Sequence, residues 1–400
     1  MKALLWHNQR DVRVEEVPEP AVRSGAVKIK VKWCGICGTD LHEYLAGPIF
    51  IPTEEHPLTH VKAPVILGHE FSGEVVEIGE GVTNHKVGDR VVVEPIYSCG
   101  KCEACKHGHY NVCEQLVFHG LGGDGGGFSE YTVVPADMVH HIPDEMTYEQ
   151  GALVEPAAVA VHAVRQSKLK EGEAVAVFGC GPIGLLVIQA AKAAGATPVI
   201  AVELSKERQE LAKLAGADYV LNPAEQDVVA EIRNLTNGLG VNVSFEVTGV
   251  EVVLRQAIES TSFEGQTVIV SVWEKDATIT PNNLVLKEKE VVGILGYRHI
   301  FPSVIKLISS GQIQAEKLIT KKITVDQVVE EGFEALVKDK KQVKILVSPK
   351  GHLLDYQLDH GVLTFGEIHK LMIDLPADSA FLQANLHPDN LDAAIRSVES

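Results

Sequence analysis

The chain has 400 residues, of which 45% are apolar, and carries a formal net charge of −18 at pH 7. That length allows two or three domains with substantial hydrophobic cores. The negative charge repels phosphate backbones and anionic lipid headgroups, which argues against nucleic acid or a membrane surface as a partner. The apolar runs are shorter than the roughly 20 residues that span a bilayer, and the first residues lack a signal or transit pattern. We therefore expect a cytoplasmic protein.

Residues 1–150 are dominated by short runs of β-type composition. Examples are "AVKIKVKW", "FSGEVVEIG" and "DRVVVEPI", which Gly, Pro and Asn separate from one another. Helical periodicity is weak throughout this part of the chain. The pattern predicts a compact β-rich domain.

Residues 151–290 change to an alternation of apolar strand, glycine turn and amphipathic helix. From Glu173 on, the alternation runs through "EAVAVFG", "IGLLVIQAAKAAG", "PVIAVE" and "SKERQELAKLAGA". Strands and helices of these lengths predict a doubly wound parallel sheet with helices on both faces. The fold class is therefore expected to be α/β.

Residues 291–348 mix the two kinds of element and are expected to return to the first domain. Thr324 and Gln327 are spaced as a helix capping box, and "QVKILV" resembles a closing strand. Residues 349–400 are expected to form a separate C-terminal extension of short amphipathic helices. One of those helices would be capped by Thr364 and Glu367.

The run "VFGCGPIGLL" carries the spacing of a dinucleotide-binding turn, with Gly179, Gly181 and Gly184 between a strand and a helix. Glycines in this pattern bring the pyrophosphate close to the backbone at the helix N-terminus. Glu203 ends the next strand, where a carboxylate can accept hydrogen bonds from the adenosine ribose. This favours NAD over NADP, although Arg208 nearby could contact a 2′-phosphate. A purely structural glycine turn is the alternative.

Four of the cysteines are crowded into one short stretch, "CGKCEACKHGHYNVC", as Cys99, Cys102, Cys105 and Cys113. Thiolates that converge from one loop are typical of a closed, structural zinc site. An iron–sulfur cluster is the chemical rival, but its common short run has a different spacing and a following proline. Disulfides are disfavoured in a cytosolic setting.

The remaining cysteines are Cys34, Cys37 and Cys180. A catalytic zinc needs about three protein ligands and one open position. The run "ILGHEFSGEV" offers His69 and Glu70, and "ALVEPAAVAVHA" offers Glu155 at an expected helix start. Taken singly, these side chains are equally compatible with ordinary structural roles.

Read together, these motifs resemble the zinc-dependent medium-chain alcohol and polyol dehydrogenases. The "GHE" run, the four-cysteine stretch and the "GCGPIG" turn occur in that family's order, between Met1 and about Ser348. The resemblance implies a GroES-like catalytic domain over 1–150 and a Rossmann domain over 151–290. It also implies a zinc enzyme that exchanges hydride with NAD.

The same resemblance implies roles for individual residues. Cys37 and His69 match the family's catalytic zinc ligands, and Cys34 matches none, so we expect Cys34 to pack in the core. Glu155 stands where the alcohol dehydrogenase branch has a cysteine, so either Glu70 or Glu155 is the direct third ligand. The resemblance implies further roles for residues at matching positions of the family's motifs. Thr39 would take the substrate's proton, His42 would pass it onward through the cofactor ribose, and further cofactor contacts would come from Pro182, Ile183, Thr248, Val272 and Tyr297.

Long runs look most like the butanediol dehydrogenase (acetoin reductase) branch of that family, including "VKWCGICGTDLHEYLAGPIFIP" and "LVEPAAVAVHAVRQSKLK". The expected substrate is a small vicinal diol or hydroxyketone, for which Leu45, Ile49, Phe50 and Ile51 supply apolar pocket lining. Butanediol-type relatives need not carry the four cysteines, so their presence in this chain departs from that branch. A sorbitol-like polyol dehydrogenase or an L-threonine dehydrogenase is the alternative, and a non-enzymatic dinucleotide-binding protein is a remote one. We also expect a homo-oligomer, either a dimer or a tetramer.

Overall fold

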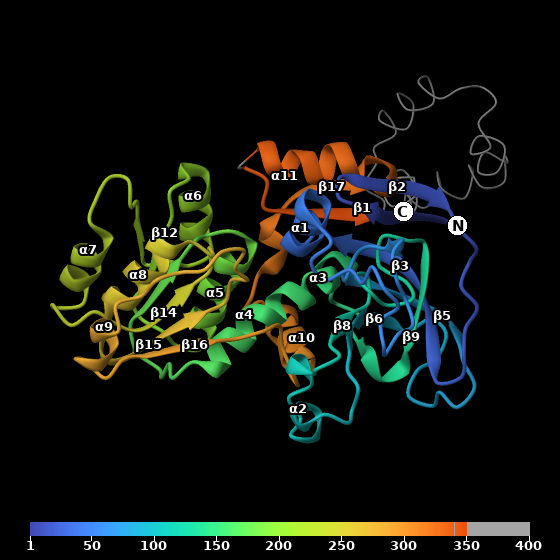
Figure 1. Ribbon diagram of the computed structural model, residues 1–400, viewed down its shortest axis with the longest axis horizontal. Helices are drawn as coiled ribbons and strands as arrows, with labels where there is room; N and C mark the ends of the chain where they lie inside the picture. The colour runs from blue at the N-terminus through green and yellow to red at the C-terminus, as the bar shows by residue number, and fades with distance from the viewer. Residues whose placement is uncertain (340, 350–400) are drawn as a thin grey trace, which may run out of the picture. The chain divides into compact units, whose positions relative to one another are not determined.

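The computed structural model describes residues 1–339 and 341–349 (Figure 1). Strands dominate the N-terminal part, and alternating strands and helices follow it. The amphipathic helices expected within 349–400 fall outside the described residues, apart from position 349 itself. The domain boundaries 1–150, 151–290, 291–348 and 349–400 stay predictions.

The N-terminal part is built on a largely antiparallel sheet of strand order β10-β6-β5-β3-β18-β17, with β9 also paired to β3. Its strands are β3 (Ala26–Gly35), β5 (Glu70–Ile78), β6 (Arg90–Val93), β9 (Tyr131–Pro135), β10 (Val139–His141), β17 (Ile319–Thr324) and β18 (Lys344–Ser348). A smaller sheet and a strand pair complete it, with β1 (Lys2–Asn8), β2 (Asp11–Glu16) and β4 (Val65–Ile66) in the first and β7 (Ile96–Tyr97) and β8 (Val117–Phe118) in the second. The strands expected from the β-type runs are confirmed.

The core of this part is a cluster of β-branched and aromatic side chains. Trp6, Ile29 and Phe71 are almost completely buried within it. The helices and 3₁₀ turns of this stretch of the chain are α1 (Gly38–Ala46), α2 (Glu103–Lys106), η1 (Tyr110–Val112), η2 (Ala136–Met138), α3 (Tyr148–Ala152) and α4 (Val154–Gln166). Residue Glu155 lies in the first turn of α4, as the sequence predicts.

The last strands of the described chain return to this first sheet. Strand β18 runs antiparallel to β3, with Val347 opposite Cys34 and Leu346 opposite Gly35. The expected closing strand is thereby confirmed, and it brings residues more than 300 positions apart side by side.

The capping box of Thr324 and Gln327 is present, but the segment after it is not one regular helix. It runs through a 3₁₀ turn, a π-type stretch and a short α-helix, with bounds η4 (Val325–Gln327), η5 (Val328–Phe333) and α11 (Glu334–Lys338). Gly332 lies in the π-type stretch, where a Cβ would lie 2.6 Å from Ile36 Cδ1, so this stretch packs closely on Ile36.

Residues from Val175 to Gly293 form a parallel sheet of order β13-β12-β11-β14-β15-β16. The strands are β11 (Val175–Phe178), β12 (Val199–Val202), β13 (Tyr219–Leu221), β14 (Val241–Glu246), β15 (Thr261–Ile269) and β16 (Glu290–Gly293). The helices between these strands are α5 (Pro182–Ala193), α6 (Lys206–Leu214), α7 (Val228–Leu235), α8 (Glu251–Ser260) and α9 (Asn282–Val285). After the last strand come α10 (Phe301–Ser309) and η3 (Ala315–Leu318). This strand order is that of a doubly wound nucleotide-binding sheet, which confirms the expected fold class.

In the part of the chain that the structure describes, no helix is both long and apolar enough to cross a lipid bilayer. This agrees with the short apolar runs of the sequence.

The approach of helix α5 to the glycine turn depends on Gly184. A Cβ at this position would overlap the carbonyl oxygen of Gly179. In an exposed helix, Gly→Ala raises the free energy of unfolding by up to about 1 kcal/mol. A decrease at Gly184 would therefore indicate a steric clash with the turn. We predict that Gly184→Ala lowers the free energy of unfolding by about 1–3 kcal/mol, because the turn must be displaced. Chemical denaturation of the full chain measures the change.

Gly293→Ala is the matched control, because a Cβ there would meet nothing within 4 Å. Its free energy of unfolding should stay within about 0.5 kcal/mol of the parent value. Equal stability of Gly184→Ala and the parent chain would contradict the close packing of helix on turn.

Candidate active site and metal centres

Three predicted metal ligands meet at the end of strand β3. The ligand atoms of Cys37, His69 and Glu70 all lie within 4.8 Å of one another. Strand pairing explains this, because Gly35 lies opposite Glu70 in the β3–β5 ladder and Cys37 follows two residues later as the N-cap of α1. His69 precedes Glu70 directly. The cluster therefore follows from the register of two neighbouring strands.

Asp40 orients the cysteine and the histidine of this cluster. Its Oδ2 accepts a hydrogen bond of 3.0 Å from the Cys37 backbone N–H. Its Oδ1 lies 3.4 Å from His69 Nδ1, and the Asp40 and His69 side chains are almost completely buried. A histidine that binds a metal through one ring nitrogen commonly turns the other toward a carboxylate. The position of Asp40 fits that arrangement.

Glu70 is shared between the cluster and a buried lysine. Its Oε2 lies 2.6 Å from Lys344 Nζ, which also donates to the Ile36 carbonyl at 3.0 Å. Among the described residues, nothing hydrogen-bonds to the buried Glu70 Oε1. Burial raises the pKa of the Cys37 thiol, and the charge of Glu70 raises it further. A cation bound among these atoms would remove both penalties, so the donor set fits a metal such as zinc.

Glu155 faces the same region but stands apart from the three clustered ligands. Its Oε1 accepts a hydrogen bond of 2.8 Å from the Tyr297 hydroxyl. Burial raises the pKa of Glu155 to about 7, with opposing contributions from His69 and Glu70. The geometry thus favours Glu70 as the third ligand, and the role of Glu155 stays a prediction.

Thr39 and His42 lie on helix α1, directly after Cys37. Thr39 Oγ1 is 3.7 Å from Cys37 Sγ. His42 is half-exposed, and its Nδ1 is 3.9 Å from Oε1 of Glu274, which follows the fifth strand of the parallel sheet, β15. Thr39 is therefore beside the cluster, and His42 is on the side toward the nucleotide-binding sheet. Their proton-relay roles stay predictions.

The glycine turn has the geometry that the motif predicts. Gly179 has a φ of +94°, and a Cβ there would lie 2.5 Å from Thr248 Cγ2. Gly181 is the N-cap of α5, and Pro182 and Ile183 form its first turn. The first backbone N–H groups of α5 are thus available to a phosphate.

Glu203 lies just beyond the end of β12, next to the glycine turn. Its carboxylate accepts hydrogen bonds from the N–H of Cys180 at 2.8 Å and of Ser205 at 2.9 Å. Arg208 Nη1 would lie 4.0 Å from a Cβ at Gly181, so this guanidinium also borders the turn. Both residues are where the sequence predicts a nucleotide-ribose site.

Two further predicted cofactor contacts differ in their surroundings. Val272 is 57% exposed after strand β15. Tyr297 is completely buried, and its hydroxyl is bonded to Glu155. Its position connects it to the metal cluster, while its contact with a cofactor stays a prediction.

The four-cysteine stretch folds into a compact metal site around helix α2. The ligand atoms of Cys99, Cys102, Cys105 and Cys113 lie within 4.8 Å of one another, and all are free thiols. Backbone N–H groups of Lys101 and Cys102 lower the pKa of Cys99 to about 6. Burial instead raises the pKa of Cys113 to about 12, so only part of the cluster favours the thiolate before a cation binds. The four converging sulfur atoms fit a closed zinc site.

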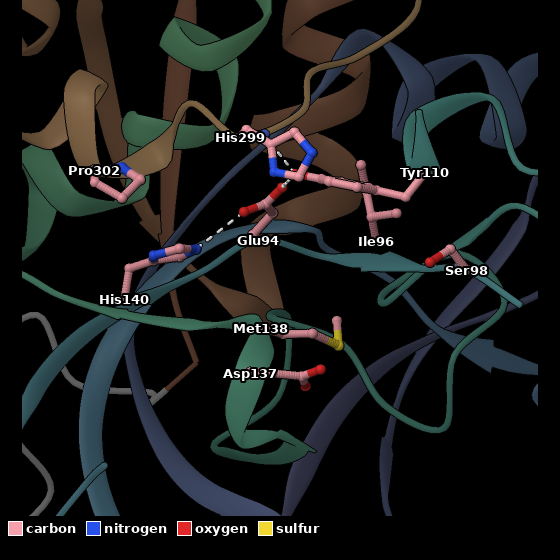
Figure 2. Close-up of a pocket in the computed structure, with 9 residues that line it drawn as sticks. All are labelled: Glu94, Ile96, Ser98, Tyr110, Asp137, Met138, His140, His299 and Pro302. Carbon is pink, nitrogen blue, oxygen red and sulfur yellow. Dashed lines mark hydrogen bonds and ion pairs between the residues drawn. The ribbon is translucent and has the colours of Figure 1, made fainter. Parts of the chain in front are cut away.

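The four-cysteine lobe, residues 99–113, borders a cavity of about 520 Å³. Figure 2 shows Glu94 at its centre, between Tyr110 of the lobe and His140 of β10. Glu94 accepts hydrogen bonds from the Tyr110 hydroxyl at 2.5 Å and from His140 Nε2 at 3.0 Å. The residues that line this cavity are different from those of the catalytic cluster.

Sequence reasoning missed Asp40 and Lys344. Asp40 has a local signal, because it is the acid at the third helical position after Cys37 in a capping box. Lys344 has a weaker one, since it is the charged residue within the apolar run of β18. The buried position of Cys34 confirms the expectation that this thiol packs in the interior, and Cys180 is buried as well.

Comparison with known proteins identifies the family. Residues 23–144 match the alcohol dehydrogenase GroES-like domain, and residues 182–310 match the zinc-binding dehydrogenase family. The chain belongs to the zinc-binding medium-chain alcohol dehydrogenases. Family membership and the two clusters together confirm the predictions of zinc, of a GroES-like part and of a Rossmann-type part.

Individual relatives are similar over nearly their whole length. The chain is 63% identical to (R,R)-butanediol dehydrogenase of Bacillus subtilis (strain 168), over 87% of this chain and 100% of that relative. It is 37% identical to the sorbitol dehydrogenase of the same strain, over 87% of this chain and 97% of that relative. The crystal structure of 2R,3R-butanediol dehydrogenase from Bacillus subtilis has a TM-score of 0.83 and 62% identity, covering 87% of this chain and 99% of that one.

Replacing a ligand in either cluster should remove one zinc ion. The loss should affect turnover at the catalytic cluster and stability at the four-cysteine cluster. Cys37→Ser should lower turnover at least about a hundredfold, because a Lewis acid contributes several kcal/mol to such a reaction. Cys99→Ser should instead lower the free energy of unfolding by more than about 2 kcal/mol. Elemental analysis, steady-state kinetics and denaturation of the full chain measure these effects.

Cys34→Ser is the matched control, because Cys34 Sγ lies 3.7 Å from the Gly35 carbonyl and belongs to neither cluster. This variant should keep both zinc ions. Loss of one zinc in Cys37→Ser with undiminished turnover would contradict the assignment of the catalytic centre.

Proposed function

We propose that the chain is an NAD-dependent zinc dehydrogenase that interconverts 2,3-butanediol and acetoin. The observation that carries this proposal is the cluster of Cys37, His69 and Glu70, which offers a metal three ligands from within 4.8 Å. The 63% identity with a butanediol dehydrogenase over that relative's whole length supports the substrate.

The residues of the cluster have distinct tasks in this reaction. Cys37, His69 and Glu70 hold the ion, while Asp40 and Lys344 fix the orientation and charge of these ligands. Zinc bound there supplies a Lewis acid, which lowers the pKa of an alcohol substrate toward neutrality.

Oxidation of the diol transfers one hydride from the carbinol carbon to NAD⁺ and releases one proton from its hydroxyl. Thr39 relays the proton, since its hydroxyl is beside Cys37 and can take up the substrate's proton as it gives its own toward His42. His42 passes the proton toward solvent, because its ring is half-exposed on the side of the nucleotide-binding sheet. In the direction of acetoin reduction the same two residues return the proton.

The segment after helix α1 supports a small and partly apolar substrate. Ile49 and Phe50 are 46% and 43% exposed, whereas Ile51 is buried in the hydrophobic core. The buried carboxylate of Glu43 fixes this segment by accepting the N–H of Ile49 at 3.0 Å and that of Ile51 at 3.2 Å. Ile49 and Phe50 therefore offer the apolar contacts that flanking methyl groups need, while Ile51 serves the core.

Glu203 supports NAD as the cofactor. A carboxylate in this position can accept hydrogen bonds from ribose hydroxyls but repels a 2′-phosphate. Arg208 borders the same turn and is the residue through which NADP would gain affinity. The proposal of NAD thus depends on the carboxylate outweighing the guanidinium.

A sorbitol-like polyol dehydrogenase remains the second candidate, because a sorbitol dehydrogenase is 37% identical over 97% of its length. An L-threonine dehydrogenase would use the same machinery. A non-enzymatic dinucleotide-binding protein would have no use for the buried cluster of Cys37, His69 and Glu70.

A substrate panel separates these candidates. Oxidation of (R,R)-, meso- and (S,S)-butanediol, sorbitol and L-threonine, and reduction of acetoin, should be followed by nicotinamide absorbance with NAD(H) and with NADP(H). We expect kcat/KM for a butanediol isomer with NAD to exceed that for sorbitol, threonine or any NADP reaction by at least about tenfold.

The Cys37→Ser chain is the blank for this assay, since it retains the nucleotide site. Higher kcat/KM for sorbitol than for every butanediol isomer would favour the polyol alternative. Failure of all substrates in a fully zinc-loaded chain would favour the non-enzymatic one.

A cytoplasmic homo-oligomer is part of the same proposal. Four clustered free thiols suit a reducing compartment. Strand β16 is the edge of the parallel sheet, and near it Phe263 and Leu286 are 61% and 73% exposed. An edge strand beside exposed apolar side chains is a surface suited to a second copy of the chain.

Light scattering of the full chain should therefore give a dimer or a tetramer. Leu286→Glu should shift the distribution toward smaller species, because it places a charge in the shared surface. Leu239→Glu is the control, since Leu239 is similarly exposed, at 62%, but follows helix α7. A monomeric parent chain at assay concentrations would contradict this part of the proposal.

A further inference from the structure

A third group of possible metal ligands, with two histidines, lies outside the two zinc sites already described. The ligand atoms of His85, Asp89 and His141 are within 4.8 Å of one another. His85 and Asp89 belong to the turn between β5 and β6, and His141 ends β10. Strand pairing brings them together, because His141 lies opposite Val91 in the ladder between β10 and β6.

Both imidazoles turn the same nitrogen toward the aspartate. His85 Nδ1 is 4.0 Å and His141 Nδ1 is 3.6 Å from Asp89 Oδ2. The two rings lie against each other, with centroids 4.7 Å apart. These three atoms thus face one common point.

The opposite nitrogens of both rings bind backbone carbonyls. His85 Nε2 donates to the Ala136 carbonyl at 3.0 Å, and His141 Nε2 donates to the Asn84 carbonyl at 3.2 Å. A proton held on Nε2 leaves Nδ1 with a free lone pair in the neutral ring. This is the orientation in which proteins present histidine to a metal.

His85 supplies the independent observation that the cluster is built for a ligand. Its side chain is only 1% exposed, and within the described residues its Nδ1 has no hydrogen-bond partner. Burial lowers the pKa of His85, so the ring is neutral at physiological pH. A buried, neutral nitrogen lone pair without a partner carries a free-energy cost that a bound cation would remove.

We propose that His85, Asp89 and His141 form a third metal site, which takes a divalent transition-metal ion such as zinc through two imidazoles and one carboxylate. Ligand atoms around a tetrahedral zinc with bonds of about 2.0–2.1 Å lie roughly 3.3 Å apart. The observed separations need only a small contraction. His141 can move closer to Asp89, because its side chain is 52% exposed. The 4.0 Å between His85 Nδ1 and Asp89 Oδ2 must shorten through a small shift of the turn that carries both residues.

Lys86 is the competitor for the aspartate. Its ammonium pairs with Asp89 Oδ1, and its backbone N–H donates to Asp89 Oδ2 at 2.9 Å. The Lys86 side chain is 81% exposed, so it can move away at little cost. One lone pair of Asp89 Oδ2 remains for the ion. The neighbouring His140 points to the other side of β10, toward Glu94 (Figure 2), and leaves the site to His141.

The site is independent of the proposed reaction. It uses residues of the turn before β6 and of β10, none of which belongs to the catalytic or four-cysteine clusters. A bound ion would link that turn to the end of β10. We therefore expect it to affect metal content and thermal stability rather than turnover.

The test uses the full chain without a polyhistidine tag, already loaded at its two thiolate-containing sites. Equilibrium dialysis against graded free Zn²⁺, followed by elemental analysis, should give a third ion per chain with micromolar affinity. His141→Asn should weaken that third binding step at least about tenfold while the other two ions stay bound. The unfolding temperature of the parent chain should rise with added Zn²⁺, and this rise should be lost in His141→Asn.

His60→Asn is the matched control. His60 is another exposed histidine beside an acid, with Nδ1 2.8 Å from Glu55 Oε1. It belongs to none of the groups of possible metal ligands found among the described residues. Its φ of 58° is one that asparagine adopts readily. This variant should bind the third ion as the parent does.

Cobalt distinguishes the new site from the two sulfur-containing ones. A third equivalent of Co²⁺ should add visible d–d bands without a sulfur-to-cobalt charge-transfer band, because its ligands are nitrogen and oxygen. Saturation of the parent chain at two ions would overturn the proposal. Equal third-site affinity in His141→Asn and the parent would overturn it as well.

Discussion

The position of strand β3 between β5 and β18 is the constraint on which the active site depends. On one side the ladder sets Gly35 opposite Glu70, and on the other it sets Leu346 opposite Gly35. Cys37 follows the end of β3, so it emerges between the glutamate of one neighbour and Lys344 of the other. A slip of one residue in either ladder would turn these side chains to the opposite face.

This arrangement gathers charge where water is largely excluded. Asp40, Glu70 and Lys344 are at most 2% exposed, and the Glu70–Lys344 ion pair is only 2.6 Å long. A buried charge without a partner costs several kcal/mol, and one lysine ammonium cannot offset two carboxylates together with the thiolate that Cys37 forms when it binds a metal. The remaining negative charge is what a divalent cation neutralises. Metal affinity and the electrostatic balance of the core are thus two descriptions of one feature.

The order of elements was predictable because it is encoded locally. Apolar strands followed by amphipathic helices predict the parallel sheet, and four cysteines within one short stretch predict the lobe without knowledge of the fold. Lys344 was not predicted, because strand pairing brings it to Ile36, 308 residues away, and to Glu70. Asp40 was missed although its capping-box position is a local signal, because its second contact, with His69, appears only in the fold. The choice between Glu70 and Glu155 was open for the same reason. Only the register of β3 and β5 places Glu70 beside Cys37, while Tyr297 engages Glu155.

The described metal clusters differ in ways that follow from their donors. Four thiolates from one loop complete a tetrahedral shell and leave no position for a substrate. Cys37 comes from one segment and the adjacent His69 and Glu70 from another, and these three ligands leave a position open, as catalysis requires. His85, Asp89 and His141 also leave a position open, but their donors include no thiolate and lie outside the substrate site. Nitrogen and oxygen donors without a thiolate, one of them on the half-exposed His141, favour exchange of the ion with solvent over permanent retention. Binding there would therefore follow the supply of free metal, whereas the two thiolate-containing clusters would stay filled.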